Sequence, residues 1–141
     1  MLERVRAASA IDDVVVVVGA HEVETDARTV RCPDWERGPG ASLRRGLEEL
    51  PRETEAAVVA LADGPNLSPE AIDRVVARWR DGAGEIVAAS YEGERGHPVV
   101  VDRAAWQRVP DAGARELGAV LVACDDLGAP GDVDVPDDLN R

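Results

Sequence analysis

Asp63 is the residue of this sequence that is best placed to do chemistry. It follows residues 58–62, a run of small and β-branched side chains that predicts a central strand covered on both faces. Ligands of open α/β sheets collect outside the carboxyl ends of the strands, and Mg²⁺ prefers carboxylate oxygens that it shares with substrate phosphates. The pattern therefore predicts a magnesium ligand at Asp63. The alternative is that Asp63 only forms a turn with Gly64 and Pro65, ahead of a helix that Ser68 caps.

Asp132 and Asp134 form a second acidic group near the end of the chain. They alternate with Val133 and Val135, which is typical of a short strand with one buried face. An acidic run of this kind is usually a solvated surface. If the fold brings these carboxylates close to Asp63, together they complete a metal site.

Residues 35–47 read as a glycine-rich loop that leads into a helix, and such loops let backbone amides approach a ligand closely. The spacing is neither the lysine-containing phosphate-binding loop nor the GxGxxG fingerprint of dinucleotide sites. The alternative is a structural loop in which Ser42 caps the helix while Arg44 and Arg45 are surface charges.

Strands and helices that position these residues follow from valine runs and from turn signals. Ser68 and Pro69 predict the start of a helix, since a cap residue precedes proline at the first helical position. The short link from Ser90 to His97 predicts that the strands on either side are antiparallel neighbours. The other strands are expected at residues 14–18, 29–32 and 119–123, the first as a fully buried parallel strand.

Composition and charge narrow the class of protein. A chain of 141 residues is long enough for one domain, and its apolar content of Val, Ala and Leu without any Phe predicts thin aliphatic layers of α/β type. A net charge of −12 argues against generic binding to a nucleic-acid backbone and leaves open a local arginine cluster, and all 16 basic residues are arginines. Cys32 and Cys124 read as buried, reduced thiols of a cytoplasmic protein. No apolar run is long enough to span a membrane, and no signal peptide is recognisable.

Five segments of the chain stand out together: GPGASLRRGL (38–47), VVALADGPNLSPEAID (58–73), GERGHPVVVDRAAW (93–106), DAGAR (111–115) and DVDVPDDL (132–139). In their order and at about their spacing they resemble the MobA-like NTP transferases. Within that family the chain is most similar to the molybdenum-cofactor cytidylyltransferase branch.

The resemblance implies a Rossmann-like, three-layer α/β/α fold with a mainly parallel mixed sheet, of the nucleotide-diphospho-sugar-transferase kind, over residues 1–141. It implies transfer of CMP or GMP from CTP or GTP to a phosphate-bearing acceptor such as molybdopterin, with release of pyrophosphate and with Mg²⁺ as cofactor. By the same resemblance the site residues are Asp63 and Asp134 as catalytic metal ligands with Asp132 second, Gly40 and Ser42 beside the nucleotide, and Gly96, His97 and Pro98 in an acceptor-side turn.

The sequence departs from the family at its beginning. The family opens with a strand and a loop of the type LAAGxSxRMGxxK, which holds the triphosphate, and nothing similar precedes Leu2. A first strand is therefore expected to be missing, and the activity of this chain is expected to be near background. Three hypotheses follow: a start codon assigned too late, an inactive remnant that binds a nucleotide or a partner, or a sheet edge completed by a second copy or another chain.

Overall fold

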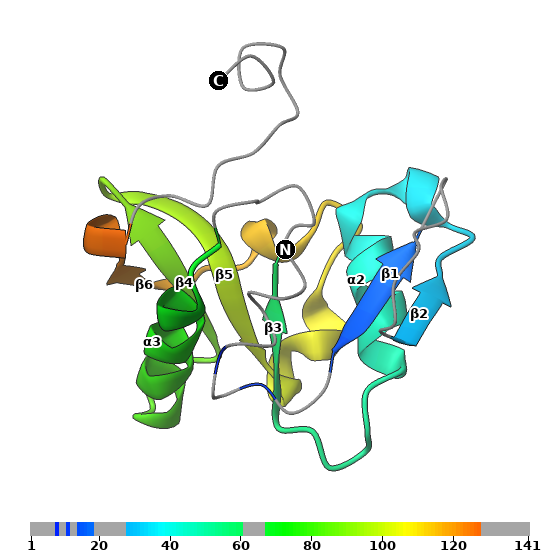
Figure 1. Cartoon of the computed structure of the whole chain (residues 1–141). Helices are drawn as coiled ribbons and strands as arrows, with labels where there is room; N and C mark the ends of the chain where they lie inside the picture. The colour runs from blue at the N-terminus through cyan, green and yellow to red at the C-terminus, as the bar shows by residue number, and fades with distance from the viewer. Residues whose placement is uncertain (1–7, 9–10, 12–13, 19–27, 61–66, 128–141) are drawn as a thin grey trace.

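Two sheets form the framework of the molecule (Figure 1). The computed structural model describes residues 8, 11, 14–18, 28–60 and 67–127. Strands β1 (Val15–Val18) and β2 (Arg28–Arg31) pair in parallel as one sheet, and a four-stranded sheet has the order β3–β5–β4–β6. The strands of that second sheet are β3 (Ala56–Val59), β4 (Ile86–Tyr91), β5 (Glu94–Asp102) and β6 (Val120–Ala123). The predicted mixed α/β class is confirmed.

Strand β5 runs against both of its neighbours. It pairs antiparallel with β3 and β4, while β4 pairs in parallel with β6. The antiparallel pair expected from the short link is confirmed. A two-residue turn joins β4 and β5, and its residues Glu92 and Gly93 have φ values of 55° and 82°, as a tight hairpin turn of type I′ requires.

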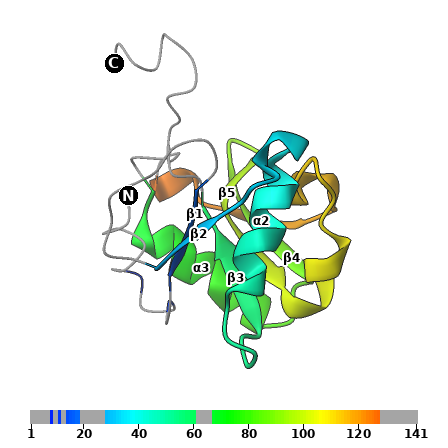
Figure 2. The ribbon, with the colours of Figure 1, turned by 90° about the vertical axis from the view of Figure 1, so that its right-hand side faces the viewer.

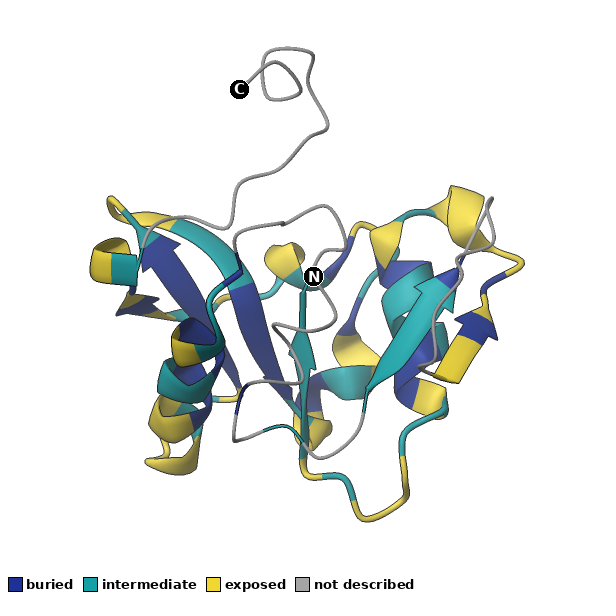
Figure 3. Cartoon of the chain, in the orientation of Figure 1, coloured by how far each residue is buried: buried dark blue, intermediate teal, exposed yellow. Residues whose placement is uncertain are grey.

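Two expectations about the strands were wrong. Strand β3 is not central among the described residues, because it pairs along one edge only, with β5, and its four residues are half-buried. Strand β1 is not fully buried either, since only Val18 is buried while residues 15–17 are half-buried. The physical reason is that β1 belongs to a sheet of two strands, which offers it a single neighbour in the described part of the chain (Figure 3).

Helix α3 (Pro69–Arg80) begins as the sequence predicted. The Ser68 hydroxyl accepts hydrogen bonds from the backbone N–H groups of Glu70 and Ala71, at 3.2 and 3.4 Å. Helix α2 (Pro39–Glu48) begins earlier than expected, with Gly38 at its N-cap, so Ser42 lies inside the helix and the prediction that it is the cap was wrong. The remaining helical pieces are 3-10 turns: η1 (Trp35–Arg37), η2 (Arg103–Arg108), η3 (Ala114–Glu116) and η4 (Asp125–Leu127).

Two thin aliphatic layers cover the four-stranded sheet, one on each face, and further buried side chains such as Leu47 lie on α2. On one face, α3 packs Ile72 and Val75 against Val87 and Val100. The other layer gathers small side chains beside η2 and η3: Ile86, Ala88, Val99, Val101 and Ala105. Figure 2 shows α3 and these 3-10 turns on opposite sides of the sheet.

Both cysteines, Cys32 and Cys124, are buried free thiols, as expected from the sequence. Within the described segments, no helix has the length and apolar character that crossing a bilayer requires.

The α3 layer should be sensitive to lost volume at Ile72, which is 0% exposed. We expect Ile72→Ala to lower the free energy of unfolding by roughly 2–5 kcal/mol, because it leaves a cavity, and Ile72→Val by about 0.5–1.5 kcal/mol. Urea denaturation followed by circular dichroism measures both. Equal effects of the two variants would contradict the packing described here.

Candidate functional site

The strand directions support a shared site at one edge of the four-stranded sheet. Strands β3 and β4 both run antiparallel to β5, and β6 runs parallel to β4. The carboxyl ends of β3, β4 and β6 therefore lie at the same end of the sheet, which is the edge meant here. The chain passes this edge at Ala60, just before the predicted ligand Asp63. Asp63, Asp132 and Asp134 themselves lie outside the described residues, so their convergence stays a prediction. Among the described residues there is no group of three or more potential metal ligands.

Gly96, His97 and Pro98 lie at this edge, although not in a turn as expected. They belong to β5, and the turn is formed by Glu92 and Gly93. The pairing register places Ala88 opposite Val99 and Ser90 opposite Arg95, so the three residues 96–98 stand opposite Ala89 alone. This is a strand bulge, a feature that often re-aims side chains next to active sites.

The bulge lies next to the strand that leads to Asp63. Val99, which follows the bulge, is the partner of Val59, the last residue of β3. The structure therefore brings the predicted acceptor residues Gly96 and His97 to the point where β3 continues toward residue 63.

Tyr91 holds the bulge, a role that the sequence did not reveal. Its hydroxyl donates a hydrogen bond to the carbonyl oxygen of His97, at 2.8 Å. A Cβ atom at position 96 would lie 3.0 Å from two carbons of the Tyr91 ring, which explains a glycine there. Burial, and then the neighbouring Cys124, raise the pKa of Tyr91 to about 12.

The start of α2, which carries the predicted site residues Gly40 and Ser42, lies against residues 110 and 111. The Gly40 N–H group donates to the Asp111 carbonyl at 2.8 Å. A Cβ on Gly40 would lie 1.6 Å from the carbonyl oxygen of Pro110, and one on Gly38, whose φ is 132°, would lie 2.3 Å from that of Asp111. Both glycines are therefore required by this backbone contact. That Gly40 and Ser42 also contact a nucleotide stays a prediction.

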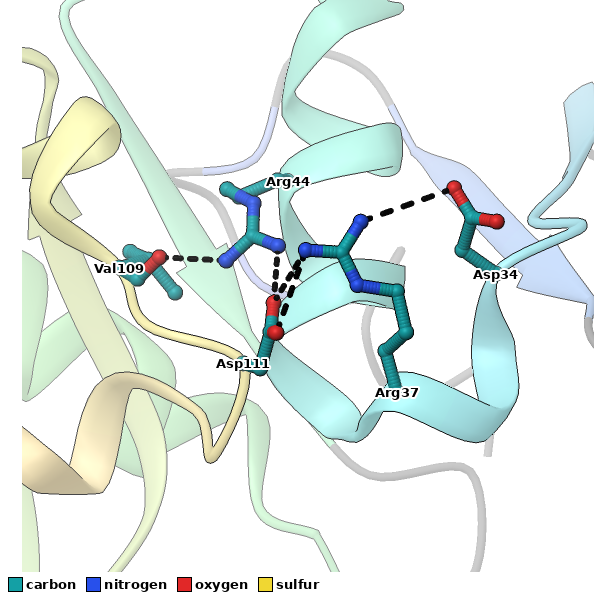
Figure 4. A network of polar contacts seen from close by, with 5 residues as sticks. All are labelled: Asp34, Arg37, Arg44, Val109 and Asp111. Carbon is teal, nitrogen blue, oxygen red and sulfur yellow. Dashed lines mark hydrogen bonds and ion pairs between the residues drawn. The ribbon is translucent and has the colours of Figure 1, made fainter.

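Arginines from two elements converge on the Asp111 carboxylate (Figure 4). Arg44, on α2, forms an ion pair with it and donates to the Val109 carbonyl at 2.6 Å. Arg37, on η1, lies 3.2 Å from the second carboxylate oxygen and 4.0 Å from Asp34. The hydrogen bond from Arg44 and the charge of Arg37 lower the pKa of Asp111.

These contacts correct the alternative reading of Arg44 and Arg45 as surface charges. It holds for Arg45, which pairs with Glu48 and Glu49 along the same helix. It was wrong for Arg44, whose partners Val109 and Asp111 are remote in the sequence and could not be identified from it.

Gly40→Ala should disturb the contact between α2 and residue 110. We expect the free energy of unfolding to fall by roughly 1–3 kcal/mol, because the added methyl overlaps the Pro110 carbonyl and forces the backbone apart. Gly118→Ala is the control, since a Cβ there meets nothing within 4 Å, and it should change stability by less than about 0.5 kcal/mol. Chemical denaturation of the two variants compares them, and equal stabilities would refute the close approach.

The phenol of Tyr91 should titrate late. Because the chain contains one tyrosine, ultraviolet absorbance of the tyrosinate reports this group alone. We expect a midpoint near pH 12 in the folded protein and near the ordinary value of 10.0 in urea. The folded pKa is raised, so this group stabilises the fold fully below pH 10.0, and the contribution is lost as the pH rises toward about 12. Coincident midpoints would show that Tyr91 is not held as described.

The fold is similar to solved structures of mycobacterial and archaeal proteins. The Rv0371c protein of Mycobacterium tuberculosis in complex with manganese matches 99% of this chain and 81% of its own, with a TM-score of 0.80 and 23% identity. A homologue of it from Mycobacterium sp. strain JC1 gives a TM-score of 0.79 at 23% identity, over 99% of this chain and 77% of its own. Molybdopterin-guanine dinucleotide biosynthesis protein A from Archaeoglobus fulgidus gives 0.62 at 16% identity, over 83% and 67%. The TM-scores show a shared fold, and at these low sequence identities the similarity is limited to the fold.

The family itself is shown by the sequence. A search of curated proteins found no significant match. The family model described as the MobA-like NTP transferase domain matches residues 1–127 and so covers most of the chain. The chain therefore belongs to the MobA-like NTP transferase domain family, and this membership supports a nucleotidyltransferase-type activity.

Proposed function

We propose that this chain transfers CMP or GMP from CTP or GTP to a phosphate-bearing acceptor such as molybdopterin, as a single cytoplasmic domain over residues 1–141. The observation that carries the proposal is the bulge at residues 96–98, next to the strand that leads to Asp63. It is supported by the family. The molybdopterin-guanine dinucleotide biosynthesis protein of Archaeoglobus fulgidus, which shares the fold, supports the choice of acceptor.

In the proposed reaction, an oxygen of the acceptor phosphate attacks the α-phosphorus of the nucleotide. The bond from the α-phosphorus to the bridging oxygen breaks, and pyrophosphate leaves. Catalysis of this kind depends mainly on positioning and on electrostatic stabilisation. Gly96 and His97 would orient the acceptor from the bulge, while Gly40 and Ser42 would contact the nucleotide from the start of α2.

The proposed metal ligands are carboxylates, Asp63 and Asp134 with Asp132 second. Carboxylate oxygens are hard donors that suit Mg²⁺, and the manganese in the related Rv0371c structure supports a divalent cation in this fold. When bound, the ion would neutralise charge on the phosphates. Cationic side chains that assist it must be arginines, since the sequence has no lysine.

A second candidate is a catalytically inactive module that binds a nucleotide or a partner chain. The observation that favours it is the pairing of β1 and β3 along one edge each within the described residues. Such edges accept an added strand from a second copy or from another protein. This candidate predicts nucleotide binding, or a stable oligomer, without turnover.

Pyrophosphate release separates the two candidates. With molybdopterin, Mg²⁺ and either CTP or GTP, we expect release that falls about 100-fold or more in Asp63→Asn and in Asp134→Asn, because a ligand to the cation is lost. Glu53→Gln, which removes an exposed carboxylate in the loop before β3, is the control and should leave the rate unchanged.

Release by Asp63→Asn at the rate of the unaltered protein would refute the metal assignment. Calorimetric binding of CTP or GTP without any pyrophosphate release would favour the inactive module.

A further inference from the structure

One carboxylate holds the start of α2, residues 38–42, from both sides; this segment is called the loop because it ends the glycine-rich loop predicted from the sequence, although residues 39–42 are already helical. Arg37 stands before Gly38, Pro39 and Gly40, and Arg44 follows them one turn into the helix, yet both guanidinium groups bind Asp111 (Figure 4). The loop is thus held from both sides by a residue that is remote in the sequence.

The backbone around Asp111 adds to this contact. The Gly40 N–H group binds the Asp111 carbonyl, and the Val109 carbonyl accepts from Arg44. A Cβ on Gly113 would lie 3.4 Å from the Pro39 ring, which is ordinary van der Waals distance. The first turn of α2 therefore packs against residues 109–113.

Helix α2 has Pro39 at its first position but no capping side chain. Its N-cap, Gly38, offers no side chain, and its first turn contains no acidic residue. Helices usually satisfy their first N–H groups with a cap side chain, and they favour negative charge at this end. In α2, the Asp111 carbonyl accepts from the Gly40 N–H group, and the Asp111 carboxylate binds Arg44 one turn further along the helix.

The ion pairs of Arg37 and Arg44 with Asp111 contribute unequally to holding the segment. The Arg37 and Asp111 side chains are 58% and 43% exposed, and exposed pairs contribute little because water screens them. The Arg44 side chain is 30% exposed and binds a carbonyl as well as the carboxylate, which restricts its geometry. Most of the positioning effect therefore passes through Arg44.

We propose that Asp111 is a positioning residue for the nucleotide: it does not touch the nucleotide itself, but it fixes through Arg44 and Arg37 the segment that presents Gly40 and Ser42. The proposal rests on the proposed function, in which those two residues contact the nucleotide.

A rival role predicts the opposite sign. Paired guanidinium groups are good phosphate ligands, so Asp111 would act as an internal competitor if a nucleotide phosphate displaced it from the arginines. Neutralising Asp111 then strengthens nucleotide binding. If Asp111 positions the loop, neutralising it weakens binding, because the loop must be ordered when the nucleotide binds.

The first measurement needs no nucleotide. In Asp111→Asn we expect the backbone amide of Gly40 to exchange with deuterium about tenfold faster than in the unaltered protein, since a charge-assisted bond that holds its acceptor is lost. Amides in the centre of β5 should keep their rates. Glu85→Gln is the matched control, because it breaks a similarly exposed pair, at 2.6 Å from Arg108, outside the loop. Unchanged exchange at Gly40 would overturn the proposal.

The second measurement is the affinity for CTP and GTP with Mg²⁺, by calorimetry. We expect Asp111→Asn to weaken it about tenfold, Asp111→Glu to retain part of it, and Glu85→Gln to leave it unchanged. In turnover, KM for the nucleotide should rise while kcat at saturation stays the same. Equal or tighter binding by Asp111→Asn would overturn the proposal and leave the proposed function standing. If the unaltered protein binds neither nucleotide, the proposed function fails, the role for a nucleotide fails with it, and the exchange rate alone decides whether Asp111 fixes the loop.

Discussion

The contact on which the described part of the molecule most depends is the close approach of the backbone at Gly38 and Gly40 to the backbone at Pro110 and Asp111. No side chain fits between these segments, since a Cβ on either glycine would overlap a carbonyl oxygen. The contact joins the part that contains β1, β2 and α2 to the part built on the four-stranded sheet. The direction of α2, and with it the place of the loop before it, is therefore set by a segment that follows β5 and η2.

Both halves of the candidate site depend on one continuous stretch of chain, from β5 to residue 113. Its beginning carries the bulge at Gly96 and His97, which Tyr91 holds, and its end carries Asp111, which holds α2. Between them, residues 99–101 are buried between two layers of small side chains. Because β5 is paired on both edges, its register is fixed. The segments that carry the predicted acceptor residues and the predicted nucleotide residues are in this way placed relative to each other by one strand and the residues that follow it.

Local signals in the sequence predicted the helix and the hairpin. The features that the sequence analysis missed depend on contacts between residues that are remote in the sequence. Ser68 and Pro69 begin α3 because a cap acts within one turn, and the short link made the antiparallel hairpin predictable. Ser42 is not the cap because α2 already begins after Gly38, whose close approach to Asp111 no local pattern reveals. Gly96 suggested a turn, but it lies in β5, where the nearby Tyr91 ring leaves little room for a side chain. The acidic metal ligands stay at the level of a prediction, since they lie outside the described residues.

Because the chain has a large negative charge, binding of an anionic nucleotide depends strongly on how the segment at the start of α2 is held. A protein with a net charge of −12 repels a triphosphate at long range, and salt screens that repulsion beyond roughly 10 Å. Affinity must then come from contacts made within that distance, by backbone amides, arginines and a cation. Contacts of this kind are effective only when their groups are held in place before the ligand arrives, because ordering them on binding costs free energy. In the role proposed for Asp111, an acidic residue that keeps this segment in place would contribute more to binding an anion than its own negative charge takes away.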